Sequence, residues 1–234
     1  MTLLKRRDIS RLKFSILILI NILAISTRTP TMMNLHWKAM TNSQLSFLPP
    51  DLPEGLSYVP DYLTSEQAQA LVSELDRQVW LCDLKRRVQH YGFRYDYKAR
   101  RARQQDFLGP LPDWLLEIAN KLYSDGYFPK LPDQVIVNEY HPGQGIAAHV
   151  DCVPCFGGQI GSISLLGGCV MRFGQVSSKQ VVDQYLEPQS LALMQGPARY
   201  DWTHAIAARK SDLVGGQRVP RGRRVSLTFR VMAF

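Results

Sequence analysis

Residues 138–151 read NEYHPGQGIAAHVD, and the stretch ends on a histidine and an aspartate two positions apart. In an extended chain the side-chain period is two, so His149 and Asp151 point the same way. A further histidine, His204, follows in the segment RYDWTHAI, residues 199–206. Two imidazoles and one carboxylate can bind iron while leaving positions open for a co-substrate and O2. We therefore expect His149, Asp151 and His204 to be catalytic metal ligands, although an isolated histidine is more often a hydrogen-bonded structural residue.

A second motif lies near the end of the chain, where residues 224–230 read RVSLTFR. Arg224 and Arg230 are an even number of positions apart, so in a strand they share one side, and the apolar residues between them face the core. Two buried guanidinium groups are costly unless they meet an anion. A dicarboxylate such as 2-oxoglutarate suits them, and Asn138 and Tyr140 could complete the pocket as neutral donors. The alternative is an edge strand whose arginines face water.

These motifs resemble the AlkB family of nucleic-acid dioxygenases, in which the order N-x-Y, H-x-D, H and R-x5-R recurs. The similarity covers about residues 55–234 and is greatest to the oxygenase domain of the tRNA-modifying AlkB homologue. It implies a double-stranded β-helix, or jelly roll, with Fe(II) at His149, Asp151 and His204. It also implies that Asn138, Tyr140, Arg224 and Arg230 hold 2-oxoglutarate, with a preference for Arg224 at the distal carboxylate, and that O2 is consumed.

The pattern of the remaining elements predicts an α+β fold with N-terminal helices packed on one sheet. Thr64 and Gln67 form a capping box ahead of apolar residues at helical spacing from Ala68 to Val79. A second helix is predicted from about Pro112 to Ser124. Short strands follow, punctuated by Gly, Pro and small polar residues; they are predicted at Gln134–Tyr140, Gln159–Leu166, Cys169–Phe173, Val181–Leu186, Ser190–Gln195, Trp202–Ala207 and Arg224–Met232.

Basic and aromatic residues interleave from Lys85 to Arg103. Cations bind phosphates, and aromatic faces stack on unpaired or flipped bases. Because the segment resembles the family's nucleotide-recognition lid, we expect Arg87, Tyr91 and Tyr97 to contact alkylated DNA or RNA, with tRNA among the candidates. An exposed charged hairpin is the alternative. Trp202 could wall the iron pocket as a substrate contact or pack the core.

The N-terminus differs in composition from the rest. The net charge is +8, and most of it lies in residues 1–50, where basic residues precede the apolar run 14–25. This run is shorter than the about 20 residues that span a bilayer, so no stable membrane insertion is expected. Residues 1–50 are interpreted as a leader or an upstream segment and 51–234 as the oxygenase domain. The protein is expected to be cytoplasmic if translation starts at a downstream methionine, organellar or secreted if residues 1–30 are a leader, and monomeric.

Cys152 and Cys155 have CxxC spacing without a second pair, which favours a loop with two thiols over a structural zinc or redox site. Three functions remain. The first is oxidative demethylation or hydroxylation of a modified base. The second is the same oxygenase chemistry on a protein side chain or small molecule. The third is a non-catalytic, cupin-like metal-binding module, which the complete set of predicted ligands disfavours.

Overall fold

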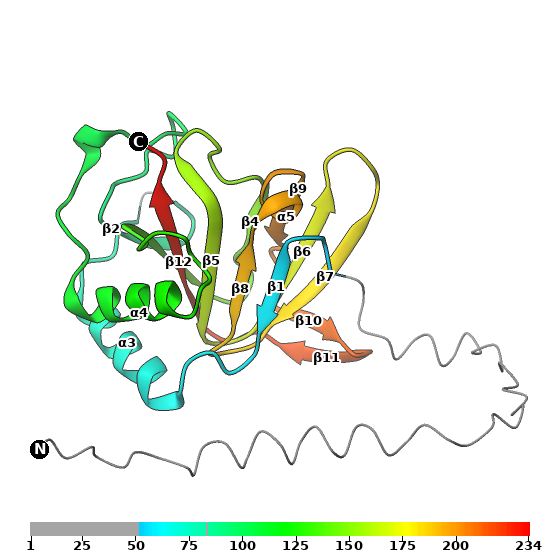
Figure 1. Cartoon of the computed structure of the whole chain (residues 1–234). Coiled ribbons are helices and arrows are strands. Elements are labelled where there is room, and N and C mark those ends of the chain that lie inside the picture. The colour runs from blue at the N-terminus through cyan, green and yellow to red at the C-terminus, as the bar shows by residue number, and fades with distance from the viewer. Residues whose placement is uncertain (1–51, 83) are drawn as a thin grey trace, which may run out of the picture. The chain divides into compact units, whose positions relative to one another are not determined.

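The computed structural model describes residues 52–82 and 84–234, and the interpretation of residues 1–50 lies outside this range. The described residues form two antiparallel sheets that face each other and a separate β-hairpin (Figure 1). The larger sheet has the order β1-β8-β5-β12-β3-β2, and the smaller has the order β4-β9-β6-β7. The strands of the larger sheet are β1 (Leu56–Val59), β2 (Arg87–Tyr91), β3 (Gln134–Tyr140), β5 (Phe156–Leu166), β8 (Leu191–Met194) and β12 (Arg224–Met232). Those of the smaller sheet and the hairpin are β4 (Ile146–His149), β6 (Cys169–Gln175), β7 (Val181–Leu186), β9 (Trp202–Ile206), β10 (Ser211–Val214) and β11 (Gln217–Pro220).

Two helices, α3 (Ser65–Arg77) and α4 (Asp113–Ser124), cover the outer face of the larger sheet (Figure 1). The predicted capping box is present, because Thr64 accepts from the Gln67 amide and Gln67 accepts from the Thr64 amide. Leu75 of α3 and Leu115 of α4 are fully buried against the sheet. Val79 was wrongly included in the first helix: it lies beyond the helix end and is 83% exposed.

Strand β12 lies at the centre of the larger sheet, between β5 and β3. Its alternation is as predicted, since Val225, Leu227 and Phe229 are at most 1% exposed and join the helix-side core. The other face of the sheet packs toward the smaller sheet through a second apolar cluster. The α+β jelly-roll expectation with helices on one sheet is therefore confirmed.

The predicted strands are all present, with ends displaced by a few residues at most, but β1, β2, β4, β10 and β11 were not predicted. These five strands are only four or five residues long. The short connections are a 3-10 turn, η1 (Gln104–Asp106), and a small helix, α5 (Gly196–Tyr200). Within the described range, no helix has the length and hydropathy needed to cross a membrane.

Candidate active site

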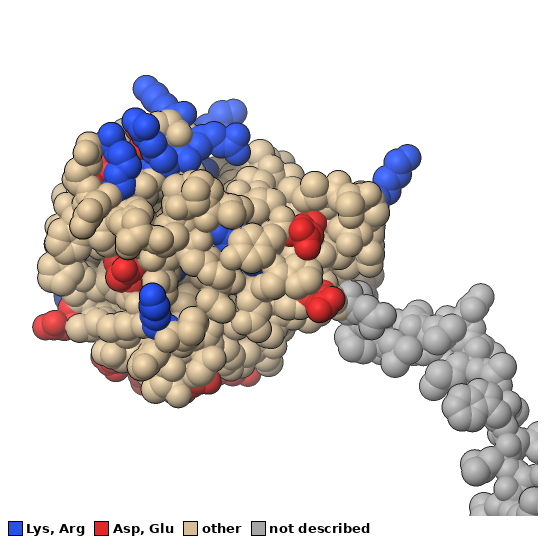
Figure 2. Space-filling view, turned by 45° about the horizontal axis from the view of Figure 1, so that its top comes forward, with Lys and Arg blue, Asp and Glu red and all other residues tan. Residues whose placement is uncertain are grey.

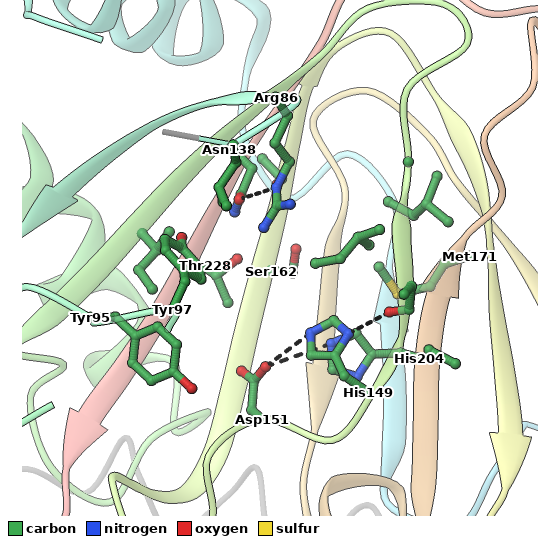
Figure 3. Close-up of a pocket in the computed structure, with 18 of the residues that line it drawn as sticks. Arg86, Tyr95, Tyr97, Asn138, His149, Asp151, Ser162, Met171, His204 and Thr228 are labelled. Carbon is green, nitrogen blue, oxygen red and sulfur yellow. Dashed lines mark hydrogen bonds and ion pairs between the residues drawn. The ribbon is translucent and has the colours of Figure 1, made fainter. Parts of the chain in front are cut away.

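A cavity of about 510 Å³ lies between the two sheets. Its walls come from β3, β5 and β12 on one side and from β4, β6 and β9 on the other. Residues 84–86 and the segment containing Tyr95, Tyr97 and Arg100 complete the wall. In Figure 3, Arg86 and Asn138 occupy one end of the cavity, whereas His149, Asp151 and His204 lie together at the other. The cavity therefore contains all seven residues predicted to bind metal or 2-oxoglutarate.

Three potential metal ligands converge at the lower end of the cavity. His149 ends β4 and pairs directly with His204 on the neighbouring strand β9, while Asp151 lies two residues beyond the end of β4. Asp151 Oδ1 is 3.4 Å from His149 Nε2 and 3.8 Å from His204 Nε2. One donor atom from each residue lies within 4.8 Å of the others. Because metal–ligand contacts are about 2.0–2.2 Å, small side-chain movements bring all three to one ion.

The protonation states of the three ligands suit a metal. His149 Nδ1 lies 2.8 Å from the carbonyl oxygen of Ala147, which can only accept, so this nitrogen carries the proton and Nε2 faces the cluster. Burial lowers the pKa of His204 to about 4, which keeps its imidazole neutral near pH 7. Burial alone would raise the pKa of Asp151, but the charge of Arg230 and the hydrogen bond with His149 hold it well below its usual value. The cluster is thus a carboxylate, the neutral imidazole of His204 and Nε2 of His149.

The two predicted arginines of β12 both line the cavity, but they differ in their partners. Arg230 donates through Nε to Asp151 Oδ2 at 2.9 Å and through Nη1 to Gln134 Oε1 at 3.1 Å. It therefore orients a metal ligand, and its contact with 2-oxoglutarate stays a prediction. Arg224 is 3% exposed and donates only through Nη2, to Ser164 Oγ at 2.8 Å.

The remaining nitrogens of Arg224, Nε and Nη1, are buried and have no hydrogen-bond partner among the described residues. Leaving a buried charged donor unpaired is costly, so an orphaned guanidinium fork in a cavity indicates an anionic ligand. A carboxylate can accept both donors at once. The fork and the metal ligands line the same cavity, so a dicarboxylate such as 2-oxoglutarate fits with one end on Arg224 and the other at the metal.

The two predicted neutral donors, Asn138 and Tyr140, both line the cavity from β3. Burial raises the pKa of the Tyr140 hydroxyl, which therefore stays protonated and able to donate. Asn138 Oδ1 accepts a hydrogen bond from Arg86 Nε at 2.8 Å. Arg86 is a cavity residue that the sequence analysis did not single out, because nothing in the sequence separates it from Arg87.

Two of the four predicted substrate contacts were wrong because of the side of β2 on which they lie. Arg87 and Tyr91 face the helices: Arg87 pairs with Glu139, and Tyr91 packs edge-on against Trp114 of α4. Neither lines the cavity. Arg86, the residue before β2, lines the cavity instead.

Of the other two predicted substrate contacts, Tyr97 lines the cavity and Trp202 does not. Tyr97 lines the cavity, and its buried hydroxyl has no hydrogen-bond partner in the described part of the chain. Burial raises its pKa to about 12, so this hydroxyl is a donor. Trp202, in contrast, is 4% exposed, lies in the inter-sheet core and does not line the cavity. Its role as a substrate contact was therefore wrong, and packing the core was the correct alternative.

The turn after Asp151 is held by two features. Cys152 and Cys155 form a disulfide, so the expectation of two free thiols was wrong. The buried guanidinium of Arg199 donates to the carbonyl oxygens of Asp151 and Cys152 at 3.0 and 3.3 Å. Arg199 was not predicted as a site residue, although it opens the segment RYDWTHAI. Both features fix the backbone that carries the carboxylate ligand.

A jelly roll that joins a His-Asp-His cluster to a buried arginine fork in one cavity is the arrangement of an Fe(II)- and 2-oxoglutarate-dependent oxygenase. The protein is accordingly an oxidoreductase that uses Fe(II), 2-oxoglutarate and O2. The sequence profile of the 2OG-Fe(II) oxygenase superfamily matches residues 79–230. This chain belongs to that superfamily, and its relatives place it among the AlkB-like members.

Several curated proteins are similar over most of this chain. A protein of Acanthamoeba polyphaga mimivirus is 33% identical over 182 residues, which are 75% of this chain and 84% of the viral protein. The alkylated DNA repair protein ALKBH8 homolog of Arabidopsis thaliana is 35% identical over 75% of this chain and 58% of its own length. The tRNA (carboxymethyluridine(34)-5-O)-methyltransferase alkbh8 of Xenopus tropicalis is 36% identical over 71% of this chain, but only 27% of its own length.

A solved structure, that of OsALKBH1, has the same fold as this chain. It superposes with a TM-score of 0.61 over 77% of this chain and 97% of its own chain, at 17% identity. At this identity the likeness concerns the fold alone.

Proposed function

We propose that this oxygenase hydroxylates a substituent on a modified base of a nucleic acid, and that an N-methyl group is removed by this route. His149, Asp151 and His204 hold Fe(II), and Arg224, with Asn138 and Tyr140, holds 2-oxoglutarate. When bound, these two groups couple oxidative decarboxylation of 2-oxoglutarate to insertion of an oxygen atom from O2 into a C–H bond. The chain's own contribution is to orient both reactants and to exclude water.

The observation that carries the choice of nucleic acid is a basic hairpin, residues 94–103, beside the cavity. Asp96 and Arg101 form a backbone bridge, and the Asp96 carboxylate accepts from the amides of Lys98 and Ala99 at the turn. Figure 2 shows Lys and Arg side chains gathered at one end of the molecule. The exposed cations of the hairpin are Arg94, Lys98, Arg100, Arg101 and Arg103.

Most of these cations have no carboxylate partner. Arg103 pairs with Asp106, but Arg94, Lys98, Arg100 and Arg101 form no salt bridge with any described residue. Four unpaired cations on one short hairpin attract a polyanion, because phosphate binding releases condensed counterions. Arg100 also lines the cavity, so the basic surface is continuous with the reaction site.

The cavity wall beside the hairpin is aromatic. Tyr95 and Tyr97 line it, with their rings 5.3 Å apart and nearly perpendicular. The same two tyrosines also form part of a neighbouring hollow that contains Arg94 and Lys98. Aromatic faces stack on bases without regard to sequence, and a base must leave a duplex stack to reach an enclosed cavity. We therefore propose that one unpaired or flipped base enters the cavity while the adjoining backbone lies on the hairpin.

The names of the relatives support nucleic acid as the substrate class. One is named for repair of alkylated DNA and another for a tRNA methyltransferase activity, and each is longer than the part that matches this chain. RNA and DNA are both to be tested, with total tRNA as the first RNA.

The test incubates the pure protein with Fe(II), 2-oxoglutarate and either total tRNA or alkylated single-stranded DNA, followed by mass spectrometry of the released nucleosides. We expect loss of one modified nucleoside, or gain of its hydroxylated form. The variant Arg100→Glu/Arg101→Glu should lose this activity while retaining substrate-independent succinate formation. The variant Lys179→Glu/Lys210→Glu is the matched control, because it reverses two exposed charges that do not line the cavity.

A protein or small-molecule substrate predicts a different result. In that case both charge-reversal variants would behave alike on every nucleic acid, and a panel of peptides would show a mass gain of one oxygen atom. Either observation overturns the assignment to nucleic acid but leaves the oxygenase chemistry intact.

A further inference from the structure

Two consecutive arginines, Arg86 and Arg87, precede and open β2, and the structure directs them to opposite sides of the larger sheet. Arg87 forms a two-point ion pair with Glu139, at 2.5 and 2.7 Å, on the helix side. On the other side of Arg86, the carbonyl oxygen of Lys85 accepts from Gln144 Nε2 at 2.6 Å. With both neighbours fixed, Arg86 projects into the cavity, as Figure 3 shows.

Arg86 contacts one of the predicted co-substrate residues directly. Its Nε donates to Asn138 Oδ1 at 2.8 Å. A guanidinium has donors and no acceptor, so it fixes which end of the Asn138 amide faces it. The oxygen is thereby engaged, and the amide nitrogen of Asn138 is left to donate elsewhere. The Asn138 side chain makes no other hydrogen bond with a described residue, so this donor is available to a ligand in the cavity.

Arg86 also adds an uncompensated charge to this end of the cavity. It forms no salt bridge within the described part of the chain. Its guanidinium carbon lies 5.9 Å from the centre of the Tyr140 ring, and that of Arg224 lies 5.5 Å from the same ring. Two cations beside one tyrosine favour a bound carboxylate. Arg86 therefore supports an anion both through its charge and through the amide that it orients.

We propose that Arg86 is a positioning residue for 2-oxoglutarate, which acts by turning the Asn138 amide nitrogen toward the co-substrate. This inference rests on the proposed function, in which Asn138 binds 2-oxoglutarate. Arg86 is not one of the four residues that the family resemblance assigned to the co-substrate. Its role follows from the hydrogen bond to Asn138 and from the two contacts that fix its neighbours.

The test measures 2-oxoglutarate binding by titration calorimetry on protein loaded with Mn(II), so that no turnover occurs. Arg86→Met should weaken binding about tenfold, the size expected when a hydrogen bond involving a charged group is lost. Arg86→Lys should weaken it less, because it keeps the charge but not the Nε donor. Arg77→Met, on the exposed face of α3, is the matched control and should bind normally. In steady-state assays of succinate formation, KM for 2-oxoglutarate should rise while kcat changes little.

A double-mutant cycle with Asn138→Ala separates positioning from an independent charge effect. If Arg86 acts through Asn138, adding Arg86→Met to Asn138→Ala should weaken binding further by clearly less than the about tenfold effect expected in the wild-type background, and the remainder reports the loss of the charge alone. Multiplicative effects would overturn the proposal, as would Arg86→Met binding within twofold of the wild type. A normal affinity in Asn138→Ala alone would instead overturn the proposed role of Asn138. None of these measurements uses nucleic acid, so failure of the substrate assignment is detected separately.

Discussion

Replacing Arg224 by methionine should weaken 2-oxoglutarate binding without weakening the ligand-free fold. Two of its guanidinium nitrogens are buried and unpaired in the described structure. If a carboxylate accepts from both, each bond contributes about 1.5–3 kcal/mol, so their loss should raise Kd on the order of 10²–10⁴-fold. Methionine fills a similar volume and removes a buried charge that has no ionic partner. Such a replacement is neutral or stabilising by about 1–2 kcal/mol, against which the lost Ser164 bond costs about 1 kcal/mol.

The assay combines urea unfolding of the ligand-free proteins with a 2-oxoglutarate titration followed by thermal unfolding. 2-Oxoglutarate should raise the Tm of the wild-type protein by an amount that depends on its Kd. The Tm of Arg224→Met should not change at the same ligand concentrations. The reasoning would be refuted if the ligand-free variant were less stable than the wild type by more than about 2 kcal/mol while its response to 2-oxoglutarate stayed normal. Arg224 would then be a structural residue, and the anion would bind elsewhere.

Two further predictions concern stability. Arg87, together with Arg223, lowers the pKa of the buried Glu139 carboxyl to about 2, so its ionised form contributes stability above pH 4.5 that is lost as pH falls toward 2. The contribution is about 2–3 kcal/mol, and Glu139→Gln should remove it; parallel stability curves for both proteins in urea from pH 5 to pH 2.5 would contradict this. Reducing the Cys152–Cys155 disulfide with a dithiol should cost about 2 kcal/mol or less in urea unfolding, because the closed loop is short. Cys152→Ser/Cys155→Ser is its control, and loss of Mn(II) binding upon reduction would contradict the view that Arg199 also holds this turn.

Part of the site could be predicted from local spacing and strand periodicity, and the third ligand, His204, from the motif order of the family that the sequence resembles. His149 and Asp151 are two positions apart in sequence, and the even spacing of Arg224 and Arg230 places both on one face of β12. The sequence could not predict that Arg230 pairs with Asp151 whereas Arg224 does not. This difference depends on Asp151 lying within 2.9 Å of Arg230, a contact between segments far apart in sequence.

The errors at Arg87 and Tyr91 have a different physical origin. Alternation shows that they share a face of β2, but not which face meets the cavity. That is decided by the pairing of Arg87 with Glu139 on β3, since Glu139 faces the helices and its neighbours Asn138 and Tyr140 face the cavity. A five-residue strand with mixed polarity carries no signal for this choice. The disulfide was likewise missed because CxxC spacing fits both free and bonded thiols.

The charges of the cavity explain why one site can collect a metal, a dicarboxylate and a polyanion. The residues that line it include three arginines, Arg86, Arg224 and Arg230, and a single carboxylate, Asp151, so these four side chains carry a net charge of +2 before any metal binds. Fe(II) raises this positive charge further, and the dianion 2-oxoglutarate reduces it again. Metal binding should therefore strengthen 2-oxoglutarate binding, and by linkage 2-oxoglutarate should strengthen metal binding by the same factor. The remaining positive charge then faces the basic hairpin at the cavity mouth. A phosphate backbone is attracted to that mouth whether or not the co-substrate is bound, so the pocket residues rather than the hairpin must select the base.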